Sequence, residues 1–296
     1  MASLKEVRVR IASVNSTRQI TSAMKMVAAS KLRRAQNAIQ NMRPYAKKLL
    51  EIMQNISNDL ENSEEGQFST DRGDNSILIV PITSNRGLCG AFNSSVVKES
   101  LTLVRTTYAA QFQAGKVDFY CIGKKGADGL NAAGIKPKTI NAEIFDHLNF
   151  SDSNVIADLF MQQFSRKQYD KIILVYNEFK NAAVQVLKTD QLLPVVEKPV
   201  EKAQPLNETE SNYIFEPSKE EILEAIVPKT IKVQLYKALL DSFAAEHGAR
   251  MTAMHKATEN ADEMLKDLKL KYNKARQASI TNEILEIVGG AEALKG

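Results

Sequence analysis

The 296-residue sequence predicts a mixed α+β or α/β fold: a long antiparallel coiled coil of the N- and C-terminal helices with an inserted Rossmann-like α/β domain. Two observations predict this organisation. Small and apolar residues recur in steps of three and four at both ends of the chain, which is the spacing of a coiled-coil seam. Short apolar runs alternate with helical segments in the middle, which favours a parallel sheet with crossover helices. The expected divisions are a coiled-coil helix over residues 1–61, the α/β domain over 76–196 and a second coiled-coil helix over 213–296.

The N-terminal helix is predicted from a strict three-four spacing. The spaced positions are Leu4, Val7, Ile11, Val14, Arg18, Thr21, Lys25, Ala28, Leu32, Ala35, Ile39 and Met42. All are apolar except Arg18, Thr21 and Lys25. Pro44 is expected to bend this helix, because proline removes a backbone donor and clashes with the preceding turn. The part before the bend would span about 40 residues, or roughly 60 Å.

The middle of the chain is predicted to form a small parallel sheet. In chain order, the expected elements are strands over 77–83, 117–122 and 171–176, helices over 95–112 and 153–166, and an edge strand from 183–187 and 192–196. Strand, helix and strand at this spacing indicate parallel strands joined by crossover helices. Polar linkers over residues 62–75 and 197–212 are expected to bracket the domain.

The C-terminal helix is predicted to run from about Lys219 to Val288. From Lys229 onward this stretch contains no proline and only Gly248 as a weak breaker, so about 60 residues would span roughly 90 Å. The expected seam consists of Ala238, Ser242, Ala245, Ala249, Thr252, Met254, Ala257, Ala261, Met264 and Leu268. Small side chains in this seam would let the N-terminal helix approach closely.

An antiparallel pairing leaves about 20 residues of the longer helix without a partner in this chain. This overhang carries Ile280, Ile284, Leu285, Ile287 and Val288. These side chains are apolar enough to require a sleeve formed by other proteins. The alternative is a long hairpin whose tip folds back on itself. The first interpretation describes a shaft that enters a partner.

The charge is unevenly distributed, although the net charge is only +4. Residues 1–50 contain eleven basic residues against the single acid Glu6, whereas residues 51–75 contain seven acidic residues against Arg72. A basic helix can bind nucleic acid, an anionic membrane or an acidic protein surface, or can present a solvated face opposite the seam. No apolar run approaches 18 residues, so no membrane span is expected. Cys89 and Cys121 are too few for a disulfide scaffold or a zinc site and suit a reducing compartment.

The sequence contains no convincing active site, so the protein is expected to be a non-enzyme without cofactor or metal. Glycine-rich turns over residues 84–93 and 123–129 follow predicted strands and could cradle phosphate, although a tight strand-to-helix turn is the simpler interpretation. Neither matches the P-loop or the dinucleotide-binding pattern. His147, His247 and His255 form no metal-ligand pair and no Ser/His/Asp arrangement. A small nucleotide-dependent enzyme therefore stays only a rival hypothesis.

Four motifs resemble the gamma subunits of F-type ATP synthases. They are residues 11–32 (IASVNSTRQITSAMKMVAASKL), 86–90 (RGLCG), 246–254 (EHGARMTAM) and 272–283 (YNKARQASITNE), the last continuing through Glu286, Gly290 and Ala291. The spacing Ile-Thr-x-Glu-x-x-Glu-x-x-x-Gly-Ala in the last motif is highly specific for that family. The resemblance covers nearly the whole chain and is weakest in the two linkers.

The resemblance implies a central rotor shaft. In this family the terminal helices form a curved coiled coil inside a ring of three alpha and three beta subunits, and rotation couples a proton- or sodium-driven membrane ring of c subunits to ATP synthesis or hydrolysis. The implied partners are the alpha, beta, epsilon and c subunits, with alpha, beta and this chain in a 3:3:1 ratio. Without a recognisable transit segment, a bacterial origin and a peripheral position on the cytoplasmic face of the plasma membrane are expected. A basic coiled-coil protein that binds nucleic acid remains the alternative.

The resemblance also implies contact residues, carried over by position. Arg276, Gln277, Thr281, Glu283, Met24 and Lys25 match positions that contact the alpha/beta ring, and Met24 and Lys25 lie where the first helix faces an acidic loop of a beta subunit. Tyr213, Phe215, Glu216 and Pro217 resemble the foot that meets the c-ring and epsilon.

Two residues depart from the family pattern. Asn85 stands where aspartate is frequent, and Ala91 stands where glycine is common. Both lie in the glycine-rich turn that follows the first predicted strand, so the geometry of that turn is where this chain could differ from its family. The inserted cysteine pair of the light-regulated chloroplast branch is not found, and thiol regulation is not expected.

Overall fold

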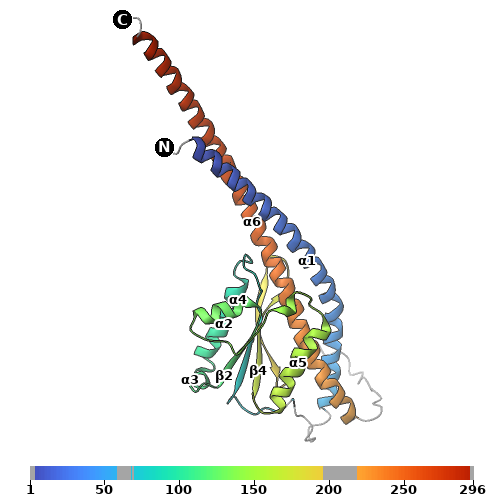
Figure 1. Cartoon of the computed structure of the whole chain (residues 1–296). Coiled ribbons are helices and arrows are strands. Elements are labelled where there is room, and N and C mark those ends of the chain that lie inside the picture. The colour runs from blue at the N-terminus through green and yellow to red at the C-terminus, as the bar shows by residue number, and fades with distance from the viewer. Residues whose placement is uncertain (1–3, 59–67, 69, 196–218, 294–296) are drawn as a thin grey trace. The chain divides into compact units, whose positions relative to one another are not determined.

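The computed structural model describes residues 4–58, 68, 70–195 and 219–293 (Figure 1). The chain divides into two compact units, one formed by residues 1–29 with 250–296 and the other by residues 30–249. Helices α1 (Leu4–Asn58) and α6 (Lys219–Ala293) each contribute to both units. The predicted linker over 197–212 and the start of the C-terminal division at residue 213 lie outside the described residues.

A five-stranded sheet forms the centre of the larger unit, in the order β3-β2-β1-β4-β5. Its strands are β1 (Ile77–Pro81), β2 (Val117–Ile122), β3 (Thr139–Asn141), β4 (Lys171–Phe179) and β5 (Gln185–Leu193). The first four are parallel, and β5 pairs antiparallel with β4 at the edge. The predicted fold class is confirmed, although several elements differ from the prediction. The expected edge strand is one continuous element, and the helix expected over residues 95–112 is divided into two. The short strand β3 and a helix over Lys124–Ala132 were not anticipated.

Helices cover both faces of this sheet. One face packs against α5 (Phe150–Ser165) and the start of α6, and the other packs against α2 (Phe92–Arg105), α3 (Ala109–Gln113) and α4 (Lys124–Ala132). Along β1, Ile77 and Ile79 belong to the second core while Leu78 and Val80 belong to the first, because successive side chains point to opposite faces. Burial on both faces explains why these strands read as continuous apolar runs.

Helix α1 continues through Pro44 to Asn58, so the proline at which a bend was expected does not end the helix. An interior proline removes one backbone hydrogen bond and strains the preceding turn, but packing on either side can keep the helix intact. Ile39 is buried before the proline and Leu49 after it. The predicted apolar row holds: Val7, Ala28, Leu32, Ala35 and Ile39 are all buried.

The predicted seam of α6 is right in its first half, and in its second half Met254, Ala261 and Leu268 are also buried as predicted. Ala238, Ser242, Ala245 and Ala249 are buried as expected, but Met264 is 49% exposed and Thr252 is exposed. Buried Leu265 takes the place of Met264, and Thr258, which faces α1, shares the place expected for Ala257. The buried positions therefore step by four and then three beyond Met254, the reverse of the predicted order.

The connections at the carboxyl ends of β1 and β2 are packed against each other. Thr83 Oγ1 accepts a hydrogen bond from the Gly126 amide at 2.7 Å, and the Lys125 amide donates to the Ser84 carbonyl at 3.0 Å. Asn85 Oδ1 accepts from the Lys124 amide at 3.1 Å, while Asn85 Nδ2 donates to the Ala142 carbonyl at 2.6 Å. The first turn of α4 is thus capped from the β1 side, which the sequence did not reveal.

An ion pair between the half-exposed Arg43 guanidinium and a buried Asp241 carboxylate connects the two long helices within the larger unit. Arg43 Nη2 on α1 lies 2.8 Å from Asp241 Oδ1 on α6, and the Asp241 side chain is completely buried. Burial raises the pKa of the Asp241 carboxyl above its ordinary value, although the nearby Arg43 guanidinium opposes this shift. The folded protein therefore holds a proton on this carboxyl more tightly than the unfolded chain does.

The raised pKa of Asp241 predicts a specific pH dependence. Ionisation of Asp241 weakens the fold as the pH rises from the ordinary carboxyl pKa through the raised one, because the unfolded state loses its proton first. Asp241→Asn cannot ionise, so its stability relative to wild type should increase over this range. Thermal unfolding of both proteins between about pH 4 and pH 8 measures the difference. Asp128→Asn, at an exposed pair, gives the background; a wild-type protein that gained stability relative to Asp241→Asn as the pH rose would contradict the prediction.

Gly123 is expected to tolerate no side chain. A Cβ there would lie 2.0 Å from the Thr83 carbonyl oxygen, and its φ is +96°. Gly123→Ala should destabilise the protein by at least about 3 kcal/mol through backbone clash and strain. Gly134→Ala is the matched control, because its φ is +81° but an added Cβ meets nothing within 4 Å. Comparable melting temperatures for the two variants would show that the clash with the Thr83 carbonyl oxygen does not set the cost of the substitution.

Candidate functional site

The smaller unit is an antiparallel pair of helices with a polar layer across its seam. Thr21 Oγ1 lies 2.8 Å from Thr258 Oγ1, and Arg18 Nη1 donates to Asp262 Oδ1 at 3.2 Å. Lys25 Nζ lies 3.3 Å from His255 Nδ1. The α1 numbers rise as the α6 numbers fall, which defines the antiparallel register. Extending this register places Leu4, where α1 begins, opposite about residue 276 of α6.

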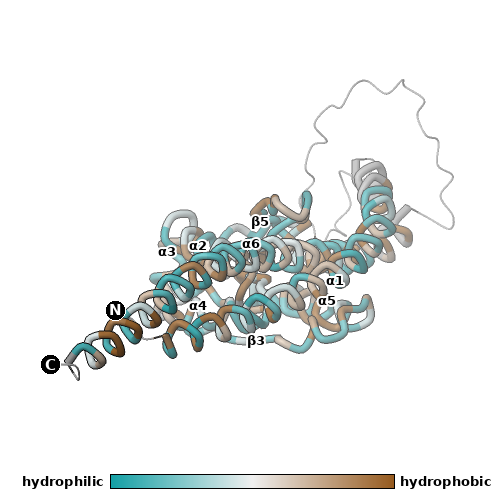
Figure 2. Tube along the Cα trace, turned by 90° about the horizontal axis from the view of Figure 1, so that it is seen from above, coloured by the Kyte–Doolittle hydropathy of each residue, from teal (hydrophilic) through white to brown (hydrophobic). Residues whose placement is uncertain are grey.

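Beyond that point, α6 is exposed on every side. Figure 1 shows α6 continuing past the N-terminal end of α1, and Figure 2 shows brown apolar segments alternating with teal ones near the C-terminus. The exposed fractions are 48% for Ile280, 54% for Ile284, 63% for Leu285, 70% for Ile287 and 52% for Val288. The predicted overhang is confirmed, and the alternative of a tip that folds back onto these side chains is wrong for the described residues. Exposed apolar surface of this kind marks an interaction site.

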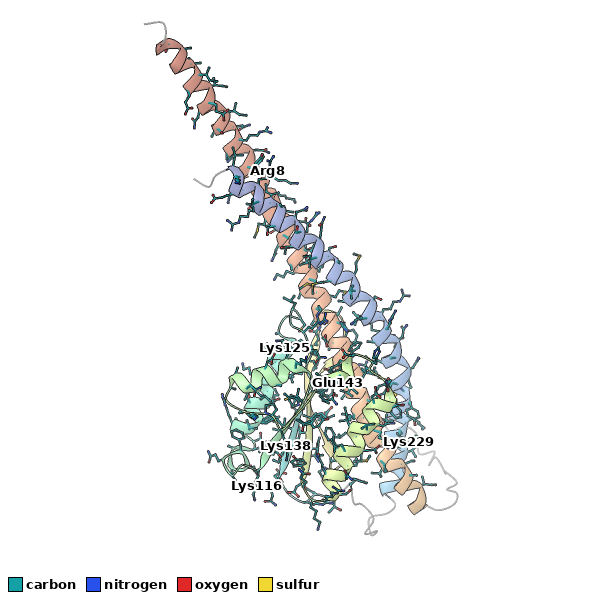
Figure 3. All side chains as sticks on the ribbon, in the orientation of Figure 1. Arg8, Lys116, Lys125, Lys138, Glu143 and Lys229 are labelled. Carbon is teal, nitrogen blue, oxygen red and sulfur yellow. The ribbon has the colours of Figure 1, made fainter. Side chains whose placement is uncertain are left out.

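A basic groove runs between α1 and α6 next to the overhang. It has a volume of about 630 Å³ and is lined by Arg8, Ile11, Ala12, Asn15, Arg18, Asp262, Leu265, Lys266 and Lys269. Arg8 is labelled in Figure 3, close to the N-terminal end of α1. Four of the lining side chains are basic, and the one acid, Asp262, already pairs with Arg18. The sequence signalled the basic residues of α1 but missed that Lys266 and Lys269 join them.

The residues predicted to contact a ring fall into two places. Arg276, Gln277, Thr281 and Glu283 lie at and beyond the end of the pairing and are all exposed. There, Thr281 Oγ1 donates to the Gln277 carbonyl at 2.9 Å. Met24 and Lys25 lie on the paired part of α1 and are half-buried. The predicted foot residues Tyr213, Phe215, Glu216 and Pro217 lie outside the described residues.

Lys25 sits at the rim of the helix pair and not inside the seam. Its ammonium contacts His255, and His255 Nε2 in turn lies 3.6 Å from the Glu259 carboxylate. Arg18, expected to form a positive strip with Lys25, is partly neutralised by Asp262. Lys25 is therefore the more available of the two cations for an acidic partner.

The glycine-rich turns do not form a phosphate cradle. An anion at the start of α4 would need the amides of Lys124, Lys125 and Gly126, and all three already donate to oxygens of Asn85, Ser84 and Thr83. The turn over residues 84–93 is filled by its own contacts, since Asn93 bonds both Ser84 and Cys89. These turns are structural connections.

The described parts of the chain were also considered for a metal site, a reactive thiol and a membrane span. No group of three His, Cys, Asp or Glu side chains there could hold a metal ion. Burial raises the pKa of the Cys121 thiol to about 12, so it stays protonated and is a poor nucleophile. Among the described helices, none is long and apolar enough to cross a membrane. The features that point to function are the exposed end of α6 and the basic groove beside it.

Comparisons with known proteins show what the whole chain resembles. The family model described as ATP synthase matches residues 3–294. The ATP synthase gamma chain of Flavobacterium johnsoniae is 57% identical over 297 residues, covering all of both chains. Among solved structures, a chain of the central stalk and c-ring of Tetrahymena thermophila mitochondrial ATP synthase is 30% identical, with a TM-score of 0.56, covering 80% of this chain and 99% of that one. A chain of the Euglena gracilis mitochondrial ATP synthase rotor has the same fold, at 20% identity and a TM-score of 0.64, covering 94% and 98%.

Proposed function

The chain belongs to the ATP synthase gamma chain family, and we propose that it is the central rotor shaft of an F-type ATP synthase. It couples ion-driven rotation of a membrane ring of c subunits to ATP synthesis or hydrolysis in a ring of alpha and beta subunits, and catalyses nothing itself. The observation that carries this proposal is the apolar end of α6, which is exposed over residues 280–288 and requires a surrounding protein.

The mechanism is geometric. A single asymmetric helix pair inside a ring with three equivalent sites cannot contact all three sites alike. Each orientation of the shaft therefore favours a different conformation at each site, through differences in contact free energy. Rotation changes which site receives which contacts, so the nucleotide affinities of the three sites alternate.

The ring contacts are proposed at the point where the helix pair ends. Arg276 and Gln277 lie where the register places Leu4, the first residue of α1, and both side chains are exposed. Arg276 offers a planar guanidinium suited to bidentate contact with carboxylates. Thr281 and Glu283 follow on the next turns and are exposed to the same surrounding protein. These four residues are proposed to contact the alpha/beta ring.

A second contact is proposed along the paired helices. The lining of the basic groove combines the buried apolar Leu265 with the basic side chains of Arg8, Lys266 and Lys269. Such a surface suits an acidic segment, because complementary charge speeds encounter and fixes register. Met24 and Lys25 lie on the same pair of helices and are proposed to face an acidic loop of a beta subunit.

The proposed location is the cytoplasmic face of a bacterial plasma membrane, reached through the complex. Tyr213, Phe215, Glu216 and Pro217 are proposed as the foot that meets the c-ring and epsilon. Co-purification from the native host tests the whole assignment: alpha, beta and this chain in a 3:3:1 ratio, with epsilon, is expected. A nucleic-acid-binding coiled coil, which none of these relatives supports, would instead retain DNA or RNA in a strongly salt-dependent manner.

Removal of α6 from Ile280 onward should weaken assembly and torque but leave the α/β domain folded. The removed side chains have no contacts that bury them in the described chain, so their burial depends on the ring. Circular dichroism of the truncated chain and reconstitution with alpha and beta subunits measure the two effects. Loss of the chain's own fold would show that the overhang stabilises the subunit itself.

Replacement of Arg276 and Gln277 together by alanine should lower coupled ATP synthesis and ATP hydrolysis by at least about tenfold, because one charge-assisted hydrogen bond to a desolvated partner contributes about 1.5–3 kcal/mol and about 1.4 kcal/mol corresponds to a factor of ten. Lys256→Ala, at an exposed position on the paired part of α6, is the control. Normal turnover and normal ion pumping in the double variant would remove both residues from the ring contact.

Lys25→Glu should leave the isolated chain about equally stable while impairing ion pumping by the assembled complex. Stability should hardly change because the Lys25–His255 contact is exposed, and such contacts contribute little. Pumping should fall because the new carboxylate would repel an acidic partner. Thermal melting of the free chain and ATP-driven pumping of the complex form the paired measurement. A large fall in melting temperature with normal pumping would confine Lys25 to the helix pair.

A further inference from the structure

Arg43 connects three elements of the larger unit through one nitrogen. Its Nη2 donates to Asp241 Oδ1 at 2.8 Å and to the Phe179 carbonyl at 2.9 Å. Arg43 belongs to α1 and Asp241 to α6, and Phe179 is the last residue of β4. One guanidinium thus joins both long helices to the sheet at the point where β4 turns towards β5.

Stability alone does not account for this arrangement. The Asp241 side chain is fully buried, and its Oδ2 has no hydrogen-bond partner among the described residues. The Arg43 side chain is 45% exposed, so its attraction to Asp241 is partly screened by solvent, while Asp241 bears the full cost of burial. What an apolar pair cannot supply is the directional bond from Arg43 to the Phe179 carbonyl.

The same hairpin also lies directly against α6. A Cβ at Gly248 would meet the Ala182 Cα at 3.3 Å, the Ala182 carbonyl oxygen at 3.4 Å and the Phe179 Cε2 at 3.4 Å. Gly248, which the sequence marked only as a weak helix breaker, therefore permits a close approach between α6 and the β4–β5 turn. The hairpin is held by Arg43 at one point and by close packing at another.

We propose that Arg43 is a positioning residue that fixes the α/β domain to the two shaft helices, so that rotation of one is transmitted to the other. This inference rests on the proposed rotor function. Apolar contacts resist separation of packed surfaces but have no preferred direction, whereas a charge-assisted hydrogen bond fixes an angle. The bond from Arg43 to the Phe179 carbonyl limits slippage of the β4–β5 hairpin along α1 and α6 under torque.

The test compares Arg43→Met with the double variant Arg43→Met/Asp241→Leu in the purified complex. The single variant leaves a buried carboxylate without its counter-charge, so it should melt at a lower temperature. The double variant removes that charge and should recover the melting temperature without recovering the bond to Phe179. Arg34→Met, an exposed site on the same helix, is the control for loss of a surface cation.

Two measurements decide the matter. Hydrogen exchange of the hairpin amides over residues 180–184 should be at least about tenfold faster in both Arg43 variants, as expected for loss of one charge-assisted hydrogen bond. The number of ions pumped per ATP hydrolysed should fall in both. Wild-type exchange and pumping in the double variant would overturn the proposal, since Arg43 would then serve only to neutralise Asp241. Failure of the chain to co-purify with ATP synthase subunits would overturn the rotor function instead. The hydrogen-exchange rates of the hairpin would still show whether Arg43 holds it against the two long helices.

Discussion

The apolar surface of α6 faces three different surroundings along a single helix, and the rest of the structure follows from this constraint. Ile231, Leu235 and Leu239 pack in the core of the sheet, whereas Met254, Leu265 and Leu268 are buried in the helix pair. From Ile280 onward the apolar side chains are exposed. The side of the helix that is apolar must change where the neighbour changes, so α6 has no single amphipathic face over its length.

This constraint explains which parts of the helix pair could be predicted. The row along α1 was readable because its buried residues keep one phase from Val7 to Ile39. Beyond Met254, Ala261 and Leu268 were predicted correctly, but Ala257 and Met264 were chosen where Thr258 and Leu265 face α1, because alanine, threonine and methionine fit either phase of a three-four spacing. The structure decides by polar matches: Thr258 meets Thr21 and Asp262 meets Arg18, which fixes Leu265 as the next buried residue. Pairing the polar residues at seam positions of the two helices would have predicted the correct phase of α6.

In the α/β domain, the central strands could be predicted because burial on both faces makes them continuous apolar runs. The edge strand β3 is short and largely exposed, so it lacks that signal. Helix α4 was hidden by Gly126 and Gly129, which disfavour helices in water. A Cβ at Gly126 would lie 2.8 Å from Thr83 Oγ1, and one at Gly129 would lie 2.8 Å from Val97 Cγ2. Close packing therefore requires glycine at two positions of this helix, although glycine disfavours a helix. Local sequence patterns do not reveal such tertiary contacts.

The site is a surface and not a pocket of reactive groups, which changes how sequence relates to function. An active site concentrates perturbed groups in one cleft, whereas here the informative features are an exposed apolar end and a groove with uncompensated basic charge. Apolar area supplies affinity without direction, and charge supplies register. A shaft that must turn inside its partner needs contacts strong enough to retain it and distinct enough to change with angle. The apolar end and the basic groove occupy different stretches of one helix pair, so in such a shaft the contacts that retain it would be separate from the charged contacts that change with angle.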